Sequence, residues 1–365
     1  MKTDYLIIGS GLAGLTFGAL MAQSGHRVTI LEAHYLPGGY GHTFELGDYK
    51  FNAQLHYVWN CGEGRSVYNM LKKLGLHEIV TFEHYDKNGF DHMRTPEYAL
   101  NVPNDYDELC LRLQKLCPND HEDIRRFITE IEEISTIIDE LPRLEWSNLS
   151  TIVPKLPQLP RFLRLMPYKD ATLQQVFDRF DLPQVAQTML ALQWPDFLLP
   201  PQNLSFVAWL MLFSGYMRGA YYPTHHFEHF INALVAVIEE NGGEICYEHE
   251  VVDFVEHDGE IKGVVARQLA QNDATITIRS NTTICNMDPR RASEIIGLEK
   301  FAPDVRNKLN YTYSASNFMA YCAVSGIDLR DYGFGKWNLF HTETLDLNKA
   351  FHQMYALGDY SAPSF

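Results

Sequence analysis

The chain has 365 residues, 46% of them hydrophobic, so it is long enough to bury a large core and to form two domains. Its 46 acidic and 30 basic residues give a formal net charge of −16, which argues against nucleic acid as a partner. The six cysteines form no CxxC pair, and the first predicted strand leaves no room for a signal peptide. We therefore expect a cytoplasmic protein, with peripheral membrane contact left open.

The chain opens with a nucleotide-binding pattern. An apolar strand runs from Tyr5 to Ile8 and leads directly into a glycine-rich turn. Such a turn lets the backbone bend sharply, approach a pyrophosphate and start a helix whose first N–H groups face the phosphates. We predict cofactor contacts at five residues of this turn, namely Gly9, Gly11, Leu12, Ala13 and Gly14.

A second parallel strand is predicted from Arg27 to Glu32, at the distance that a dinucleotide-binding fold requires. The carboxylate of Glu32 can hold the diol of a ribose, and Ala33 follows it at the end of the strand. Because this carboxylate would repel a 2′-phosphate, NADP is the least expected occupant.

The adjacent residues Gly38 and Gly39 allow the backbone to pass against a second phosphate and then a ring system, which favours a flavin over a nicotinamide. A simple turn after the second strand is the alternative. We include His42 and Thr43, which follow the two glycines, among the predicted cofactor contacts.

A further apolar strand is predicted over residues 51–59, and it contains His56 and Tyr57. A packed core pair is at least as good an interpretation of these two residues as a catalytic pair. Since no serine elbow, Cys/His pair or carboxylate dyad stands out, the chemistry should come largely from the cofactor.

Residues 90–222 are predicted to be mostly helical. An amphipathic helix spans Asn119 to Leu141, and a shorter one spans Thr172 to Phe180. The run from Leu204 to Met217 is the most apolar in the chain, but it is shorter than the ~20 residues that span a bilayer. We interpret it as a core helix, with the wall of an apolar substrate tunnel or a membrane-dipping surface as alternatives. Four prolines predict a non-helical linker between the first two helices: Pro142, Pro154, Pro157 and Pro160.

The pattern returns to α/β after this region. A helix from Phe227 ends at Gly242, and an antiparallel meander with a turn at Asp258 and Gly259 is predicted after it. Its strands are Glu244–Val255, Ile261–Arg267, Thr275–Ile278 and Thr282–Cys285. His225 and His229 could share a helix face as metal ligands, but no third ligand accompanies them, so we predict a helix start and no metal site.

Together these motifs resemble the flavoprotein family of bacterial-type phytoene desaturases, carotenoid isomerases and retinol saturases, with the retinol saturase branch most similar. Four segments carry the resemblance: Gly9 to Gly39, GGYGHTF with YKFNAQLHY, RGAYYP with the NGGEI turn, and ICNMDPRRASEIIG. The third segment leads to Val251, whose backbone meets the adenine in this family. The chain departs from the family pattern at Asn52 and Gln54, and it has Tyr40 where amine oxidase relatives carry arginine.

The resemblance implies an α/β fold in which a Rossmann-type, two-dinucleotide-binding FAD domain contains an inserted, largely helical substrate domain. Expected boundaries are 1–90 and 223–300 for the FAD domain, 91–222 for the helical domain, and 301–365 for substrate-domain strands. It also implies FAD as cofactor, an apolar polyene or isoprenoid as substrate, and oxidoreduction of its C–C bonds by a desaturase, saturase or isomerase. His56 and Tyr57 are the catalytic hypothesis.

Two alternatives stay open at this point. One is a flavin-dependent amine oxidase, which uses the same nucleotide fold. The other is a C-terminally incomplete fold that does not hold FAD, since the glycine-rich segment with which this family closes its flavin site is not found before residue 365.

Overall fold

A computed structural model describes residues 2–140 and 159–364, and the chain divides into two compact units, described separately below. Unit 1 contains the residues up to Glu83, Tyr222–Tyr313 and Tyr321–Ala323. Unit 2 contains His84–Tyr221, Ser314–Ala320 and Val324–Phe365. Within the described ranges, no helix has both the length and the apolar content needed to cross a membrane.

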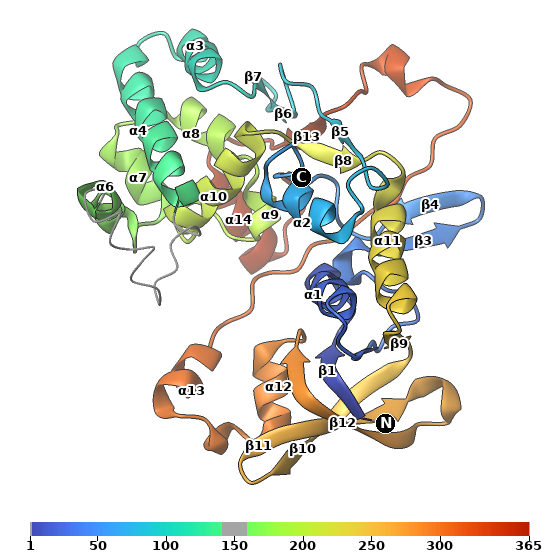
Figure 1. The fold of residues 1–365 in the computed structure, drawn as a ribbon. Helices are drawn as coiled ribbons and strands as arrows, with labels where there is room; N and C mark the ends of the chain where they lie inside the picture. Colours follow the sequence, from blue (N-terminus) through green and yellow to red (C-terminus); the bar gives the residue numbers. More distant parts are fainter. Residues whose placement is uncertain (1, 141–158, 365) are drawn as a thin grey trace. The chain divides into compact units, whose positions relative to one another are not determined.

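Unit 1 is built on a sheet that has six strands in the described part of the chain, in the order β10-β11-β12-β1-β2-β9 (Figure 1). The parallel part consists of β1 (Lys2–Ile8), β2 (Val28–Leu31), β9 (Glu244–Cys246) and the second half of β12 (Ala274–Cys285). The first half of β12 instead pairs antiparallel with β11 (Glu260–Gln268), which pairs with β10 (His249–His257). The strand β12 therefore joins the meander to the parallel sheet.

The two faces of this sheet are covered differently. On one face, Ile7 and Ile30 pack under the helices α1 (Leu12–Gln23), α2 (Ser66–Leu74) and α11 (His226–Glu240). On the other face, Leu6 and Ile8 of β1 and Leu31 of β2 pack against side chains of the meander. The meander residues of this second core are Val251, Val264, Ala266 and Ile278. Successive residues of β1 alternate between these faces because side chains of a strand point to opposite sides.

The remaining elements of unit 1 are short. The turn η1 (Gly39–Gly41) precedes a hairpin of β3 (Thr43–Leu46) and β4 (Tyr49–Asn52), and α12 (Pro289–Ile296), η6 (Leu298–Lys300) and α13 (Pro303–Leu309) follow β12. A short turn, η5 (Leu269–Gln271), lies between β11 and β12. The strands β5 (Phe82–His84) and β8 (Tyr221–Pro223) pair where the chain leaves and re-enters this unit.

Unit 2 combines helices with a small sheet, which has three strands in the described residues. In this sheet β6 (Asp91–Arg94) lies between β7 (Ala99–Val102) and β13 (Asn338–His341). Its helices are α3 (Tyr106–Leu116), α4 (His121–Glu140), α6 (Leu159–Leu163), α7 (Leu173–Arg179), α8 (Gln184–Ala191), α9 (Trp194–Phe197), α10 (Phe206–Met217) and α14 (Leu347–Phe351). Two 3-10 helices, η4 (Met166–Tyr168) and η7 (Leu329–Tyr332), and the π-helix η8 (His352–Ala356), which directly follows α14, complete this unit.

The core of unit 2 is aromatic. Trp209 and Phe213 of α10 stack with ring centroids 4.9 Å apart, and Phe127 of α4 and Phe177 of α7 lie 5.5 Å apart. All four side chains are fully buried. The apolar run in α10 is therefore a core helix, as predicted.

Several predicted elements of unit 2 are confirmed in place. Thr172 caps α7 through a capping box with Gln175, and Asp120 precedes α4. Leu141 and three of the four linker prolines, Pro142, Pro154 and Pro157, lie outside the described residues. The fourth, Pro160, stands at the second residue of α6, where its missing N–H costs little, so the prediction of a non-helical position is wrong there.

Three strand predictions need correction. The predicted strand over residues 51–59 ends at Asn52, because the Asn52 side chain accepts the Gln54 N–H at 3.0 Å and so turns the chain. The predicted strand Glu244–Val255 is two strands, divided at Glu248 with φ of 56°. The two strands predicted between Thr275 and Cys285 are the single strand β12.

Residues 301–365 also differ from the expected run of substrate-domain strands. In the described part of this range, β13 is the one strand, and the other regular elements are α13, η7, α14 and η8. Asp346 caps α14 by accepting the Lys349 N–H at 2.9 Å, and Pro303 starts α13.

Candidate functional site

The predicted glycine-rich turn connects β1 to α1. Gly9 has φ of 95°, a conformation that residues with a β-carbon rarely adopt, and Gly11 is the N-cap of α1. No side chain caps this helix, and its first turn carries no acidic residue. The first N–H groups of α1 are thus left for an anion, with Leu12 half-buried, Ala13 exposed and Gly14 buried.

Gly11 has space around its α-carbon that the protein itself does not use. A β-carbon on Gly11 would meet only the side-chain nitrogen of Asn286, at an ordinary 3.5 Å, and the backbone there has φ of −63°. Neither the backbone conformation nor a neighbour within the protein therefore demands glycine at this position. A close-lying ligand such as a pyrophosphate is a reason for it that fits the dinucleotide fold.

The two predicted glycine elements lie against each other. The Gly38 N–H donates to the Ser10 carbonyl at 2.8 Å, and Gly38 pairs with Gly11 as an isolated parallel bridge. A β-carbon on Gly39 would lie 3.1 Å from the Gly11 α-carbon, and Gly39 is exposed. The turn before α1 and the double glycine after β2 therefore present adjacent backbone to one region, as a phosphate-binding surface requires.

The Glu32 carboxylate is held beside this turn. Its Oε2 accepts hydrogen bonds from the Ser10 N–H and the Ser10 hydroxyl, both at 2.7 Å, and its Oε1 accepts the His34 N–H at 2.9 Å. Ala33, the next residue, is exposed. An oriented carboxylate at the end of β2 is the feature that a dinucleotide fold uses for a ribose.

The two remaining predicted contacts after the double glycine are placed by local bonds. The Nδ1 of His42 lies 2.7 Å from the Gly39 carbonyl oxygen, so His42 stays next to the glycines. Thr43 begins β3, and its hydroxyl lies 3.0 Å from Nδ1 of His226. Burial lowers the pKa of the His226 imidazole below its ordinary value, which favours the neutral ring.

Val251 differs from the other predicted contacts because its side chain is buried in the apolar layer under the meander. Its register partner is Ala266 of β11. The start of β10 nevertheless reaches Glu32, since the His249 N–H donates to the Glu32 carbonyl at 2.8 Å. Any ligand contact at Val251 would involve its backbone rather than its side chain.

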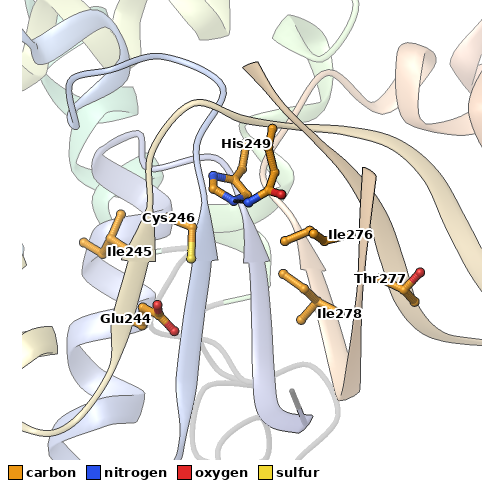
Figure 2. A pocket seen from close by; sticks show the side chains of 8 residues that line it. Glu244, Ile245, Cys246, His249, Ile276, Thr277 and Ile278 are labelled. Atoms are coloured by element: carbon orange, nitrogen blue, oxygen red, sulfur yellow. Dashed lines mark hydrogen bonds between the residues drawn. The ribbon is translucent and has the colours of Figure 1, made fainter. Parts of the chain in front are cut away.

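A half-open cavity of about 470 Å³ lies beside this strand end (Figure 2). Cys246 points into it from β9, and Ile276 and Ile278 point into it from β12. At one end, the Gln268 side-chain amide lies 3.1 Å from Nε2 of His249. Burial, together with Glu244, raises the pKa of the Cys246 thiol to about 11. None of the predicted cofactor residues lines this cavity.

His56 and Tyr57, the two residues of the catalytic hypothesis, lie in different environments. The rings of His56 and Tyr57 stack with centroids 4.8 Å apart, but His56 is exposed whereas Tyr57 is only 3% exposed. They lie in the irregular segment after β4, and their neighbours Leu55 and Val58 pack against the core of unit 1. The exposed imidazole is the member of the pair that a substrate could reach.

Two residues beside the turn were absent from the sequence-based site. Ser10 is fully buried and binds Glu32. Asn286 follows β12, where its N–H donates to the Ile8 carbonyl at 3.0 Å and its side chain faces the three glycines of the turn. The position of Asn286 in the NMDP segment, directly after a parallel strand, is the signal that could have indicated it.

His225 and His229, the two residues weighed as metal ligands, lie at the start of α11. Their ring centroids lie 5.4 Å apart, and Nε2 of His229 is 3.1 Å from the Ile79 carbonyl oxygen. Among residues 2–140 and 159–364, no cluster of three or more His, Cys, Asp or Glu side chains is arranged to hold a metal ion.

Comparison with known proteins gives one matching family model, the NAD(P)-binding Rossmann-like domain, over residues 7–74. This segment begins in the last two residues of β1 and contains the glycine-rich turn, α1, β2, the double glycine and α2. The match agrees with the dinucleotide-binding fold deduced from the strand order and the turn.

Three curated relatives are similar over longer stretches. An all-trans-retinol 13,14-reductase of Macaca fascicularis is 24% identical over 67% of this chain and 41% of its own length. Prolycopene isomerase 2 of an Oncidium hybrid cultivar is 24% identical over 72% of this chain and 45% of its own. A 4,4′-diapophytoene desaturase of Methylomonas sp is 21% identical over 95% of this chain and 68% of its own. The chain spans about half, or less, of the length of the reductases and the isomerase that it matches.

Solved structures share the fold at lower identity. The PF1083 protein of Pyrococcus furiosus matches with a TM-score of 0.56 and 16% identity, covering 86% of this chain and 66% of that one. A double mutant of putrescine oxidase matches with a TM-score of 0.57 and 12% identity, covering 84% and 63%. These likenesses show an α/β Rossmann-like fold.

Proposed function

We propose that this chain, a distant relative of carotenoid- and retinol-modifying flavoenzymes, binds FAD and forms part of an oxidoreductase that acts on C–C bonds of a long apolar polyene or isoprenoid. The observation that carries the cofactor assignment is the meeting of two glycine elements beside an oriented carboxylate. The names of the three relatives support the substrate class, since retinol, prolycopene and diapophytoene are all polyenes. They also name three reactions, so the direction of reaction is not part of the proposal.

The residues present fit FAD at its adenosine and pyrophosphate end. Glu32 would hold the ribose, the uncapped start of α1 and the Gly38–Gly39 backbone would hold the phosphates, and the backbone at Val251 would meet the adenine. When bound, FAD supplies a ring that accepts or donates a hydride equivalent. We assign unit 1, which contains all the predicted cofactor residues, to the cofactor and unit 2 to the substrate; the boundaries then lie at Glu83, Tyr222 and Tyr313 rather than at the expected residues 90, 223 and 300.

The chain's own contribution to the chemistry is then mainly to bind and align an apolar substrate and to exclude water. We assign His56, whose ring is exposed, to the substrate side of the site, and Tyr57, which is buried against it, to holding that ring in place. A membrane surface is the natural source of such a substrate, and peripheral contact with one is part of the proposal.

The cofactor assignment is tested by titrating the purified chain with FAD and following the flavin absorption and fluorescence. We expect binding with about one FAD per chain, competition by ADP, and much weaker binding of FMN, because FMN lacks the adenosine that Glu32 would hold. Binding of FMN as tight as that of FAD, or no binding of either, would contradict this assignment.

The substrate class is tested by adding all-trans-retinol, prolycopene or diapophytoene under anaerobic conditions to protein loaded with oxidised FAD and, separately, to protein whose FAD has been reduced with dithionite. With oxidised FAD, which accepts two electrons, desaturation lengthens the conjugated system and moves the absorption band to longer wavelength. With reduced FAD, which donates two electrons, saturation shortens the conjugated system and moves the band to shorter wavelength. Hydrogen peroxide release with putrescine in air-saturated buffer, and no change with any polyene, would favour the amine oxidase alternative instead.

His56→Ala tests the catalytic hypothesis. Because His56 is exposed, the fold and the FAD content should be retained while polyene turnover falls by about 10²-fold or more. Full turnover in this variant would remove His56 from the mechanism.

A further inference from the structure

Ser10 makes an unusual double contact with Glu32. It stands between the first two glycines of the turn, it is fully buried, and both its backbone N–H and its hydroxyl donate to the same oxygen, Oε2 of Glu32. The third donor, the His34 N–H, binds Oε1. A carboxylate has about four lone-pair positions, so these bonds fill both positions on Oε2 and one on Oε1.

We propose that Ser10 is a positioning residue that fixes the Glu32 carboxylate so that one hydroxyl of the adenosine ribose, and not both, donates to it, at Oε1. The inference rests on the proposed function, because it takes the bound group to be a dinucleotide with its ribose at Glu32. The new element is that Oε1 of Glu32 can still accept a hydrogen bond from the ribose, whereas Ser10 occupies Oε2.

The geometry explains why the hydroxyl of Ser10 matters in addition to its N–H. A single bond to Oε2 would still let the carboxylate turn about its last side-chain torsion, which is broad for glutamate. Two donors that converge on one oxygen, with a third on the other, hold both the position and the plane of the carboxylate. A pre-oriented acceptor costs less ordering free energy when the ribose binds.

The same geometry limits what Glu32 can recognise. Because Oε2 already accepts two hydrogen bonds, a second ribose hydroxyl would have to displace the hydroxyl of Ser10, which is buried and would lose its partner. The site should therefore distinguish the two ribose hydroxyls from each other.

The test removes one ribose hydroxyl from the ligand and the hydroxyl of Ser10 from the protein, singly and together, and measures each binding affinity by isothermal titration calorimetry. ADP, 2′-deoxy-ADP and 3′-deoxy-ADP are titrated into the wild-type protein, Ser10→Ala and a control, Ser280→Ala. Ser280 is also a buried serine of the same sheet, and its hydroxyl bonds Thr283 rather than any predicted cofactor residue. Thermal unfolding of each variant reports on the fold independently.

For the wild-type chain we expect one of the two deoxy analogues to bind about tenfold more weakly than ADP, and the other to bind within about twofold of ADP. In Ser10→Ala, ADP should bind about tenfold more weakly, whereas the sensitive deoxy analogue should bind as it does to the wild type, so the discrimination disappears. Ser280→Ala should behave as the wild type with all three ligands.

Equal weakening of both deoxy analogues in the wild type, or of neither, would overturn the single-hydroxyl inference. So would a Ser10→Ala variant that loses affinity for ADP and both analogues by the same factor, because Ser10 would then act through the fold of the turn. If the wild type binds no ADP at all, the dinucleotide site itself fails, and this inference fails with it.

Discussion

A β-carbon on Gly14 would lie 2.2 Å from the carbonyl oxygen of Gly9, closer than atoms in a folded protein approach. The first turn of α1 therefore packs directly on the end of β1 with nothing between them. Gly11, three residues earlier, has no such neighbour. Two glycines of one motif are thus required for different reasons, one by the fold and one by the proposed ligand.

The pair of variants Gly14→Ala and Gly11→Ala separates these reasons. Gly14→Ala should lower the free energy of unfolding by about 1–3 kcal/mol or more, because the added methyl group must displace backbone. Gly11→Ala should leave stability unchanged or slightly raised, since its φ suits alanine, yet it should lower FAD affinity at least tenfold. Thermal unfolding and FAD titration of both variants check this. A Gly11→Ala variant that binds FAD normally would contradict the close approach of a phosphate there.

The ion pair of Asp4 and Arg27 predicts how the stability of the β1–β2 region depends on pH. Hydrogen bonds from the Arg27 side chain and N–H lower the pKa of Asp4 from 3.8 to about 2. A carboxyl group with a lowered pKa stabilises the fold above its unfolded pKa and loses that contribution as pH falls toward its folded pKa. Asp4→Asn should therefore be less stable than the wild type at pH 7, and the difference should shrink between about pH 4 and pH 2.

Thermal midpoints of the wild type and Asp4→Asn at a series of pH values measure this difference. In an Arg27→Ala background the effect of Asp4→Asn should be smaller at pH 7, because the guanidinium that contributes most to lowering the pKa is gone while the backbone N–H of residue 27 remains. An unchanged effect in that background would show that the Arg27 side chain is not the cause.

The cavity thiol should react slowly despite its partial exposure. With a pKa of about 11, Cys246 carries about a hundredfold less thiolate at pH 8 than an ordinary thiol of pKa 9.0. Cys61, buried and with its pKa raised to about 12, should be slower still, and the exposed Cys322 should be alkylated first. Mass spectrometry after timed treatment with iodoacetamide gives the order.

The pH dependence of alkylation shows whether ionisation of the Cys246 thiol or entry of the reagent into the cavity limits the rate. Labelling of Cys246 should accelerate about tenfold for each pH unit between pH 8 and pH 10, because the thiolate fraction does. A rate at Cys246 that does not change with pH would mean that opening of the cavity, rather than ionisation, controls it.

Helix α10 offers a matched pair for testing its role as a core helix. Phe213→Ala removes a fully buried ring stacked on Trp209 and should lower the free energy of unfolding by about 3–5 kcal/mol. Met211→Ala, at a position 52% exposed on the same helix, should change it by no more than about 0.5 kcal/mol. Chemical denaturation measures both. Equal effects would mean that α10 is not packed as described.

The local motifs were predictable from sequence because their causes lie within a few residues. The strand before Gly9 and the N-terminal end of α1 follow from apolar runs and glycine spacing, and the helix α7 follows from the apolar spacing after Thr172. In the same way, the apolar run in α10 could be assigned to the core, since its length is too short for a membrane and its side chains are large.

The errors arose where a distant partner or a side-chain bond decides the conformation. The strand at residues 51–59 was predicted too long because the bond from Gln54 to Asn52, which ends β4, leaves no trace in hydropathy. The division at Glu248 and the continuity of β12 depend on which strand each segment pairs with. Ser10 was missed for a similar reason: a serine between glycines is common, and its partner Glu32 lies 22 positions away.

The strand β12 has a consequence for how the chain folds during synthesis. Asn286 directly follows this strand and bonds the Gly9 carbonyl through its side-chain amide, although it lies 277 positions after Gly9. At roughly 5–20 residues per second, the apolar strand β1 would leave the ribosome about 14–55 seconds before its partner on that side is made. Throughout that interval the edge of β1 that will meet β12 has no partner strand, while its residues Leu6, Ile7 and Ile8 are among the most buried in the finished fold. A nascent chain of this protein therefore carries an apolar strand with one unpaired edge for most of the time that these residues take to be made.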